Sequence, residues 1–121
     1  LIIINGRNVW PQDLEWAAEL VPDVRSGDVA AFAVDGEDGE GERAVLVVEC
    51  RTNDPELRSR LAKQVAAAVR SSAGIDCQVV LVPPRTLPHT SSGKLSRTRA
   101  KQSFLAGDYA PSPTEGAAPG R

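Results

Sequence analysis

The sequence predicts an α+β fold, in which a small antiparallel sheet plus an N-terminal hairpin is flanked by about three helices. Three observations predict it: apolar runs of strand length recur along the chain, apolar stripes recur at helical spacing, and proline or glycine separates these segments. With 121 residues, of which 41% are hydrophobic, the chain can bury one modest core. The expected order of elements is ββαββαβα.

The first 22 residues predict a hairpin and a short helix. "LIII" (1–4) is apolar and mostly β-branched, and it runs into Asn5-Gly6, a favoured tight-turn pair. Pro11 suits the first position of a helix, and Pro22 ends it. The apolar face of this helix comprises Leu14, Ala18 and Val21.

A second hairpin and the longest helix are expected next. "DVAAFAV" (28–34) and "RAVLVVEC" (43–50) are strand-like, and the glycine-rich segment between them favours a turn. Asp54-Pro55 predicts a capped helix start, and Gly74 predicts its end. The apolar stripe of this helix recurs every four residues, at Leu57, Leu61, Val65 and Val69.

The last third predicts a strand, a polar loop, a helix and a tail. "CQVVLVPP" (77–84) reads as a strand that its prolines stop. Ser96 can cap a final helix, which Phe104 and Leu105 would dock. Residues 110–121 lack apolar periodicity and are rich in Pro, Gly and Ala, so we expect a flexible tail or linker there.

Composition and charge exclude several classes of protein for this chain. Fourteen basic and sixteen acidic side chains give a formal charge of -2, too close to neutral for a dedicated nucleic-acid or membrane-surface protein. No membrane span or signal peptide is expected, so the predicted location is cytoplasmic. Cys50 and Cys77 lack the spacing of a disulfide framework or metal site, and we expect buried, reduced thiols. The chain has no methionine and begins inside an apolar run, as a piece of a longer protein would.

The segment "LPHTSSGKLSRTRAK" (87–101) contains the candidate site. A Walker phosphate loop would need glycine at position 88 and Ser or Thr at 95, but the sequence has Pro88 and Leu95. A turn of hydroxyls and a glycine remains, which can hold Lys94 at a loop-to-helix junction where it would suit an anion. The alternative is that these residues only form a turn and Lys94 is a solvated side chain.

Two motifs resemble those of the adenylate-forming superfamily, which includes acyl-CoA synthetases, luciferases and nonribosomal peptide synthetase adenylation domains. The pattern Pro-x-Thr-x-x-Gly-Lys-x-x-Arg near their C-terminus is matched by Pro88, Thr90, Gly93, Lys94 and Arg97. The segment after their hinge is matched by Gly6, Val9, Pro11, Leu14 and Glu15. Within the superfamily, the segment "GRN", two residues, "PQDLE" (6–8 and 11–15) resembles the fatty acyl-AMP ligase branch and its close acyl-CoA synthetase relatives.

The resemblance covers residues 1–109 and implies a mobile C-terminal subdomain. A preceding N-terminal domain would hold the fatty acid, ATP and Mg²⁺, and the hinge residue would lie just before Leu1. Lys94 would be the catalytic lysine that joins a fatty acid to the α-phosphate of ATP, with the loop shaped by Thr90, Ser91, Ser92 and Gly93. No metal ligand is expected in this subdomain.

The resemblance also implies a second step, in which the subdomain rotates and a pantetheine thiol attacks the acyl adenylate. Gly6 would let the pantetheine arm pass the backbone, because glycine has no side chain. Arg7, Asn8 and Trp10 border that strip, as contacts or as turn packing. Many relatives have Arg or Lys where Asn8 stands and Glu where Trp10 stands. The acceptor would be coenzyme A or an acyl carrier protein.

Three alternative functions remain open, one of which is a degenerate lid that is retained only as structure. The chain could be the lid of a fatty acyl-CoA synthetase with coenzyme A as its acceptor. It could instead be a non-catalytic module that binds protein or nucleic acid through residues 94–101, where Lys94, Arg97 and Lys101 would share one helix face.

Arg85 and Arg99 add charge near this basic helix face, which is either solvated or a docking surface for an acidic carrier protein. His89 has no carboxylate nearby in sequence, which favours loop filler over general base.

Overall fold

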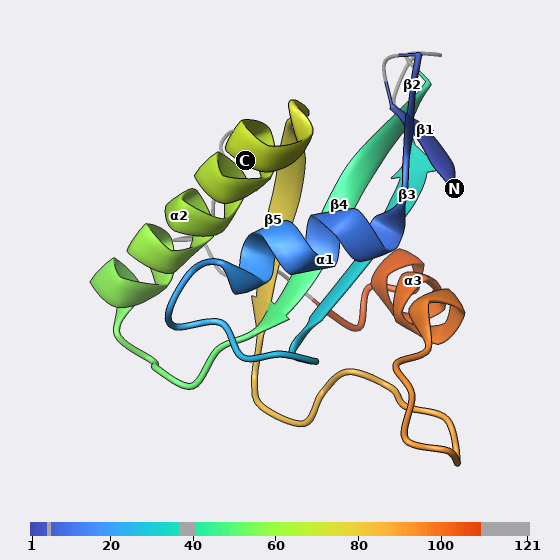
Figure 1. The fold of residues 1–121 in the computed structure, drawn as a ribbon. Helices are drawn as coiled ribbons and strands as arrows, with labels where there is room; N and C mark the ends of the chain where they lie inside the picture. The colour runs from blue at the N-terminus through green and yellow to red at the C-terminus, as the bar shows by residue number, and fades with distance from the viewer. Residues whose placement is uncertain (5, 37–40, 110–121) are drawn as a thin grey trace.

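The computed structural model describes residues 1–4, 6–36 and 41–109 and confirms the α+β class (Figure 1). The predicted tail, 110–121, lies outside the described residues. The elements follow in the predicted order: β1 (Ile2–Ile4), β2 (Arg7–Val9), α1 (Pro11–Glu19), β3 (Val29–Asp35), β4 (Glu42–Glu49), α2 (Pro55–Ala73), β5 (Cys77–Val82) and α3 (Arg97–Leu105).

The N-terminal hairpin and α1 form as predicted. β1 pairs antiparallel with β2, so that Ile4 lies opposite Arg7. Gly6 turns the chain with φ +79°, a conformation that glycine adopts without steric cost, while its predicted turn partner Asn5 lies outside the described residues. Pro11 occupies the first turn of α1, where its missing N–H costs no hydrogen bond.

The second sheet has the order β3-β4-β5 and contains the predicted hairpin. β3 and β4 pair antiparallel from Val29 opposite Val48 to Asp35 opposite Glu42. β5, however, runs parallel to β4, with Ala44 opposite Cys77 and Glu49 opposite Val82. The expectation of an antiparallel sheet is therefore wrong for this strand, and the sheet is mixed.

The crossover helix α2 explains the parallel pairing. Its 19 residues carry the chain back along the sheet, so that β5 starts at the same end as β4. The Asp54 side chain accepts a hydrogen bond from the Glu56 amide (2.9 Å) at the start of α2, and Gly74 ends the helix in the left-handed region (φ +73°). Both predicted helix signals are confirmed.

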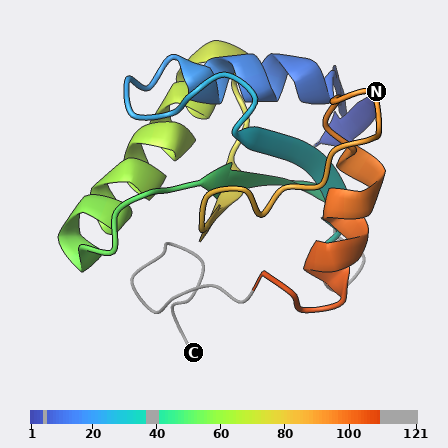
Figure 2. The ribbon, with the colours of Figure 1, turned by 90° about the horizontal axis from the view of Figure 1, so that it is seen from below.

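Both faces of the three-stranded sheet are buried. The face under α1 and α2 packs around Ala31, Leu46, Leu14, Val65 and Val69. The opposite face packs under α3 and the loop before it, around Phe32, Val47, Leu87, Ala100 and Tyr109. Seen from below, β3 lies between α1 and α3 (Figure 2). Because both faces are covered, the strands are continuous apolar runs rather than alternating ones.

Two predicted core positions are wrong. Leu105 is 63% exposed, because α3 turns Phe104 toward the sheet, where its ring lies 5.7 Å from that of Phe32. Leu57 is 45% exposed in the first turn of α2, whereas Leu61, one turn later, is buried.

Among the described residues, no helix is both long and apolar enough to cross a membrane.

Both cysteines are free, as predicted, with Cys50 buried and Cys77 half-buried. Burial, and to a lesser degree the Asp76 carboxylate, raises the pKa of the Cys77 thiol to about 12. The thiol therefore stays protonated at neutral pH and is a poor nucleophile. Because this pKa lies above that of the unfolded thiol, the stability linked to it is lost as pH rises from about 9 toward about 12.

We expect iodoacetamide to modify Cys77 much more slowly in the folded chain at about pH 8 than in unfolded chain. Mass spectrometry of a Cys50→Ser variant isolates the Cys77 reaction. The control is the same variant in urea, where the thiol should react as a free cysteine does. Equal rates in the two conditions would contradict the environment described for Cys77.

Candidate functional site

Residues 88–96 form a small hairpin, the lysine finger, between β5 and α3. His89 pairs antiparallel with Leu95. The Ser96 amide donates to the Pro88 carbonyl (3.0 Å), and the Thr90 amide donates to the Lys94 carbonyl (2.7 Å). The finger is therefore closed by its own backbone hydrogen bonds, as a turn of this length requires.

The tip of the lysine finger presents Lys94 to solvent. The chain turns at Gly93 (φ +85°), whose amide donates to the Thr90 carbonyl (2.9 Å). The Thr90 hydroxyl oxygen accepts from the Lys94 amide (3.3 Å) and bonds the Ser92 hydroxyl (2.9 Å). Ser91 is exposed at the same turn. The structure thus brings together the lysine and all four residues predicted to support it.

An ion pair between a half-exposed arginine and a buried carboxylate holds the outgoing leg of the lysine finger. Arg97, at the start of α3, donates through Nε and Nη2 to the two carboxylate oxygens of Glu15, both at 2.7 Å. Glu15 is buried in α1, and its Oε2 also accepts the Ala31 amide of β3 (2.9 Å). These hydrogen bonds raise the pKa of the Arg97 guanidinium, which stays charged. One carboxylate therefore joins α1, β3 and α3.

A second buried carboxylate holds the incoming leg. Glu49 ends β4, and its Oε2 accepts the backbone amides of Thr86 (3.1 Å) and Leu87 (3.0 Å). The chain reaches it through Arg85, which has the positive φ of +63° that is uncommon for a non-glycine residue. The Thr86 hydroxyl donates to the Pro83 carbonyl (2.6 Å), which closes that turn.

Sequence reasoning did not assign these two carboxylates. The sequence places Glu15 in a motif that gives it no role, and it places Glu49 within a predicted strand. Signals were present in both cases, because Glu15 follows a core leucine and Glu49 ends the apolar run "AVLVV". An acidic residue at such a position is unusual unless it is paired.

The predicted basic helix face is wrong in part. Lys94 precedes α3, which begins at Arg97, and Arg97 is bound to Glu15, so these residues do not form one solvated face with Lys101. Arg85 and Arg99, which add charge nearby, are exposed. The Nδ1 of His89 lies 3.0 Å from the Leu87 carbonyl oxygen, which fits a loop-filling side chain.

The residues predicted for the acceptor side lie on the N-terminal hairpin, away from the lysine finger. Arg7 donates to the Gly74 carbonyl (3.2 Å) at the end of α2, so its guanidinium has a structural contact. Asn8 is exposed, Trp10 is 59% exposed, and the Cβ position at Gly6 meets no atom within 4 Å. The hairpin and the orange loop before α3 lie at opposite ends of the fold (Figure 1).

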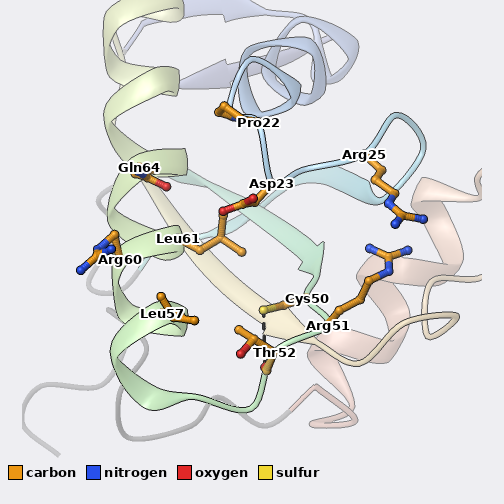
Figure 3. A pocket seen from close by; sticks show the side chains of 10 residues that line it. All are labelled: Pro22, Asp23, Arg25, Cys50, Arg51, Thr52, Leu57, Arg60, Leu61 and Gln64. Carbon is orange, nitrogen blue, oxygen red and sulfur yellow. Dashed lines mark hydrogen bonds between the residues drawn. The ribbon is translucent and has the colours of Figure 1, made fainter.

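The described residues also line a pocket of about 540 Å³ that contains none of the predicted site residues (Figure 3). It lies beside the first half of α2 and is lined by Pro22, Asp23, Arg25, Cys50, Arg51, Thr52, Leu57, Arg60, Leu61 and Gln64. Arg51 pairs with Asp28 (3.1 Å) at its edge. No group of three or more His, Cys, Asp or Glu suited to a metal ion occurs in the described part of the chain.

Comparison with known proteins identifies the family. The chain is 49% identical to a putative acyl-CoA synthetase of Caulobacter vibrioides and 34% identical to the long-chain-fatty-acid–AMP ligase FadD32 of Mycobacterium marinum. These matches cover 90% and 88% of the chain but 19% and 20% of the relatives. The chain therefore spans about one fifth of their length. No family model matches it.

Solved structures agree. A structure from a study of fatty acyl-adenylate ligases of E. coli and L. pneumophila superposes with a TM-score of 0.74 and 40% identity, covering 91% of this chain and 19% of that one. McyG, an A-PCP structure complexed with phenylalanyl-adenylate, superposes with a TM-score of 0.82 and 26% identity, covering 90% and 17%. The chain belongs to the adenylate-forming superfamily. Its relatives there are enzymes, named as acyl-CoA synthetases and fatty acyl-AMP ligases.

Proposed function

We propose that this chain is the mobile C-terminal lid, residues 1–109, of a fatty acyl-AMP ligase. One observation carries the proposal: the ammonium of Lys94 is exposed at the tip of a finger whose two legs are held by buried carboxylates. A lysine that served only solubility would need no such support. A cation on a supported projection suits delivery to a site on another domain.

The chemistry assigned to Lys94 is charge stabilisation. Formation of an acyl adenylate brings a fatty-acid carboxylate to the α-phosphate of ATP and releases pyrophosphate, so negatively charged oxygens must approach one another. An ammonium between them offsets the repulsion and stabilises charge that develops in the transition state. Thr90, Ser91, Ser92 and Gly93 shape the turn that presents it. In this proposal, ATP and Mg²⁺ would be held mainly by an N-terminal domain.

The N-terminal hairpin is assigned to the second step. A rotation of the lid would withdraw the lysine finger and bring up Gly6, past which a pantetheine arm would reach the acyl adenylate. The separation of the two motifs at opposite ends of the fold supports alternation, because one rigid body can present only one end at a time (Figure 1). The acceptor is the thiol of an acyl carrier protein in this proposal.

The proposal predicts that Gly6→Leu slows acyl transfer and spares adenylation. A leucine at Gly6 would fill the space assigned to the pantetheine arm, so we expect about a tenfold or larger loss of transfer from supplied acyl adenylate. Adenylation is followed in the full-length ligase as fatty-acid-dependent pyrophosphate exchange.

Gly27→Leu is the matched control. Gly27 has a similar positive φ (+87°) and, like Gly6, no atom within 4 Å of its Cβ position, so the backbone strain of the two variants is alike. The control should keep both half-reactions. A Gly6→Leu variant that transfers as fast as the control would contradict the acceptor role.

A fatty acyl-CoA synthetase lid is the second candidate, favoured by the 49% identical relative named as a putative acyl-CoA synthetase. The two candidates share the first step and differ in the acceptor. Product formation with coenzyme A, compared with phosphopantetheinylated carrier protein, separates them.

A further inference from the structure

The incoming leg of the lysine finger is held by the packing of Leu87 in the core and by hydrogen bonds to one buried side chain. Between Pro88 and Lys94 the finger buries no residue, so it has no core of its own. Its position relative to the sheet is set where the chain enters it, and the last buried residue there is Leu87. The contacts that hold residues 86–87, together with the Arg97–Glu15 pair on the outgoing leg, therefore set where the ammonium of Lys94 lies.

Glu49 supplies two of those contacts. Its side chain is on the face of β4 that packs under α3, two residues after Val47, and a single oxygen accepts both the Thr86 and Leu87 amides. Burying a carboxylate is costly, whereas an apolar side chain could end this strand at no such cost. Both hydrogen bonds go to the backbone that leads into the lysine finger, and a carboxylate acceptor makes each of them stronger than a neutral one.

We propose that Glu49 is a positioning residue for adenylation. It holds the lysine finger in the position, relative to the sheet, from which Lys94 can act. The inference rests on the proposed function, because it concerns the step assigned to Lys94. A misplacement of about 1 Å can cost about a hundredfold in rate, so release of the incoming leg should affect catalysis before it affects folding.

The test measures both half-reactions in the full-length ligase. Glu49→Ala should slow fatty-acid-dependent pyrophosphate exchange by about 10- to 100-fold, with acyl transfer from supplied acyl adenylate changed by less than about twofold. Adding Glu49→Ala to Lys94→Ala should cause little further loss of exchange, because both act on one step. Asp28 lies beside Glu49, which donates its backbone amide to the Asp28 carbonyl (2.9 Å), and the Asp28 side chain pairs with Arg51. Asp28→Asn is the control, because it removes a neighbouring carboxylate without touching the Thr86 and Leu87 amides, and it should leave both rates unchanged.

Two conservative variants keep the inference testable if Glu49→Ala does not fold. Glu49→Gln retains an oxygen at the same reach and should keep exchange within a few fold of the parent. Glu49→Asp retains the charge but is one methylene shorter, so it cannot reach both amides and should lose exchange. Two outcomes would overturn the role given to Glu49. One is an equal rate of pyrophosphate exchange in the two variants, and the other is a slow rate in Glu49→Gln with the parent rate in Glu49→Asp.

Failure of the inference and failure of the proposed function give different results. If Lys94→Ala abolishes exchange while Glu49→Ala keeps the parent rate, Glu49 is not a positioning residue and the proposed function stands. If Lys94→Ala keeps the parent rate, the proposed function itself fails. Equal loss of exchange and transfer in Glu49→Ala and Glu49→Asp would indicate general destabilisation and would also overturn the inference.

Discussion

Lys94→Ala in the full-length ligase is expected to slow acyl-adenylate formation by a factor of several hundred, about 3 to 4 kcal/mol of transition-state stabilisation. The reason is the loss of a positive charge between two anions in a site from which water is excluded. Transfer from supplied acyl adenylate should be largely spared, because the lysine finger would be withdrawn in that step. Lys94→Arg should also impair adenylation, since the planar guanidinium differs from a compact ammonium.

Lys63→Ala is the control for Lys94→Ala. Lys63 is exposed on α2, so the variant removes one surface ammonium without touching the lysine finger. It should leave pyrophosphate exchange at the parent rate. Because Lys94 is itself exposed, its removal should leave the unfolding free energy within about 0.5 kcal/mol of the parent. An equal loss of both half-reactions would contradict the division of labour between Lys94 and the N-terminal hairpin.

Arg97→Ala is expected to have the largest effect on stability, about 2 to 3 kcal/mol. Breaking a fully buried ion pair costs about 3 to 5 kcal/mol, and the partial exposure of Arg97 reduces this by admitting water to the abandoned carboxylate. Urea unfolding of the chain measures the loss. Hydrogen exchange at the Ala31 amide should also accelerate, because that amide donates to Glu15.

Arg99→Ala is the matched control for Arg97→Ala. Arg99 lies two residues further along α3 and is exposed, so its removal should change the unfolding free energy by less than about 0.5 kcal/mol. A Glu15→Gln, Arg97→Ala double variant should be less destabilised than the sum of the two single changes, since both remove one interaction. Additive losses would show that the two side chains do not act as a pair.

The local elements of the fold could be predicted because each carries its own signal. Pro11 and Pro55 lie in the first turns of α1 and α2, Asp54 caps α2, and Gly74 ends it in the left-handed region. Ser96 caps α3, where its hydroxyl accepts the Arg99 amide (3.3 Å). These signals depend on bonds between residues a few positions apart, so they are visible in a linear sequence.

The direction of β5 and the burial of Leu105 could not be predicted in the same way. A run such as "CQVVLV" (77–82) pairs equally well in either direction, and the length of α2 decided that it returns parallel to β4. Leu105 is as apolar as Phe104, but only one of them can face Phe32 from a helix. Both outcomes depend on contacts between distant segments.

The candidate site also has one part that local sequence predicts and one part that depends on contacts between distant segments. The lysine and its turn could be predicted from residue types and their spacing, because Thr90, Gly93 and Lys94 form one local hydrogen-bonded unit. The contacts that hold this unit in place form only when distant segments of the chain fold together. Glu49 and Glu15 lie 37 residues and more from the legs they support, and a buried carboxylate acquires its role from the amides and the guanidinium that folding brings to it.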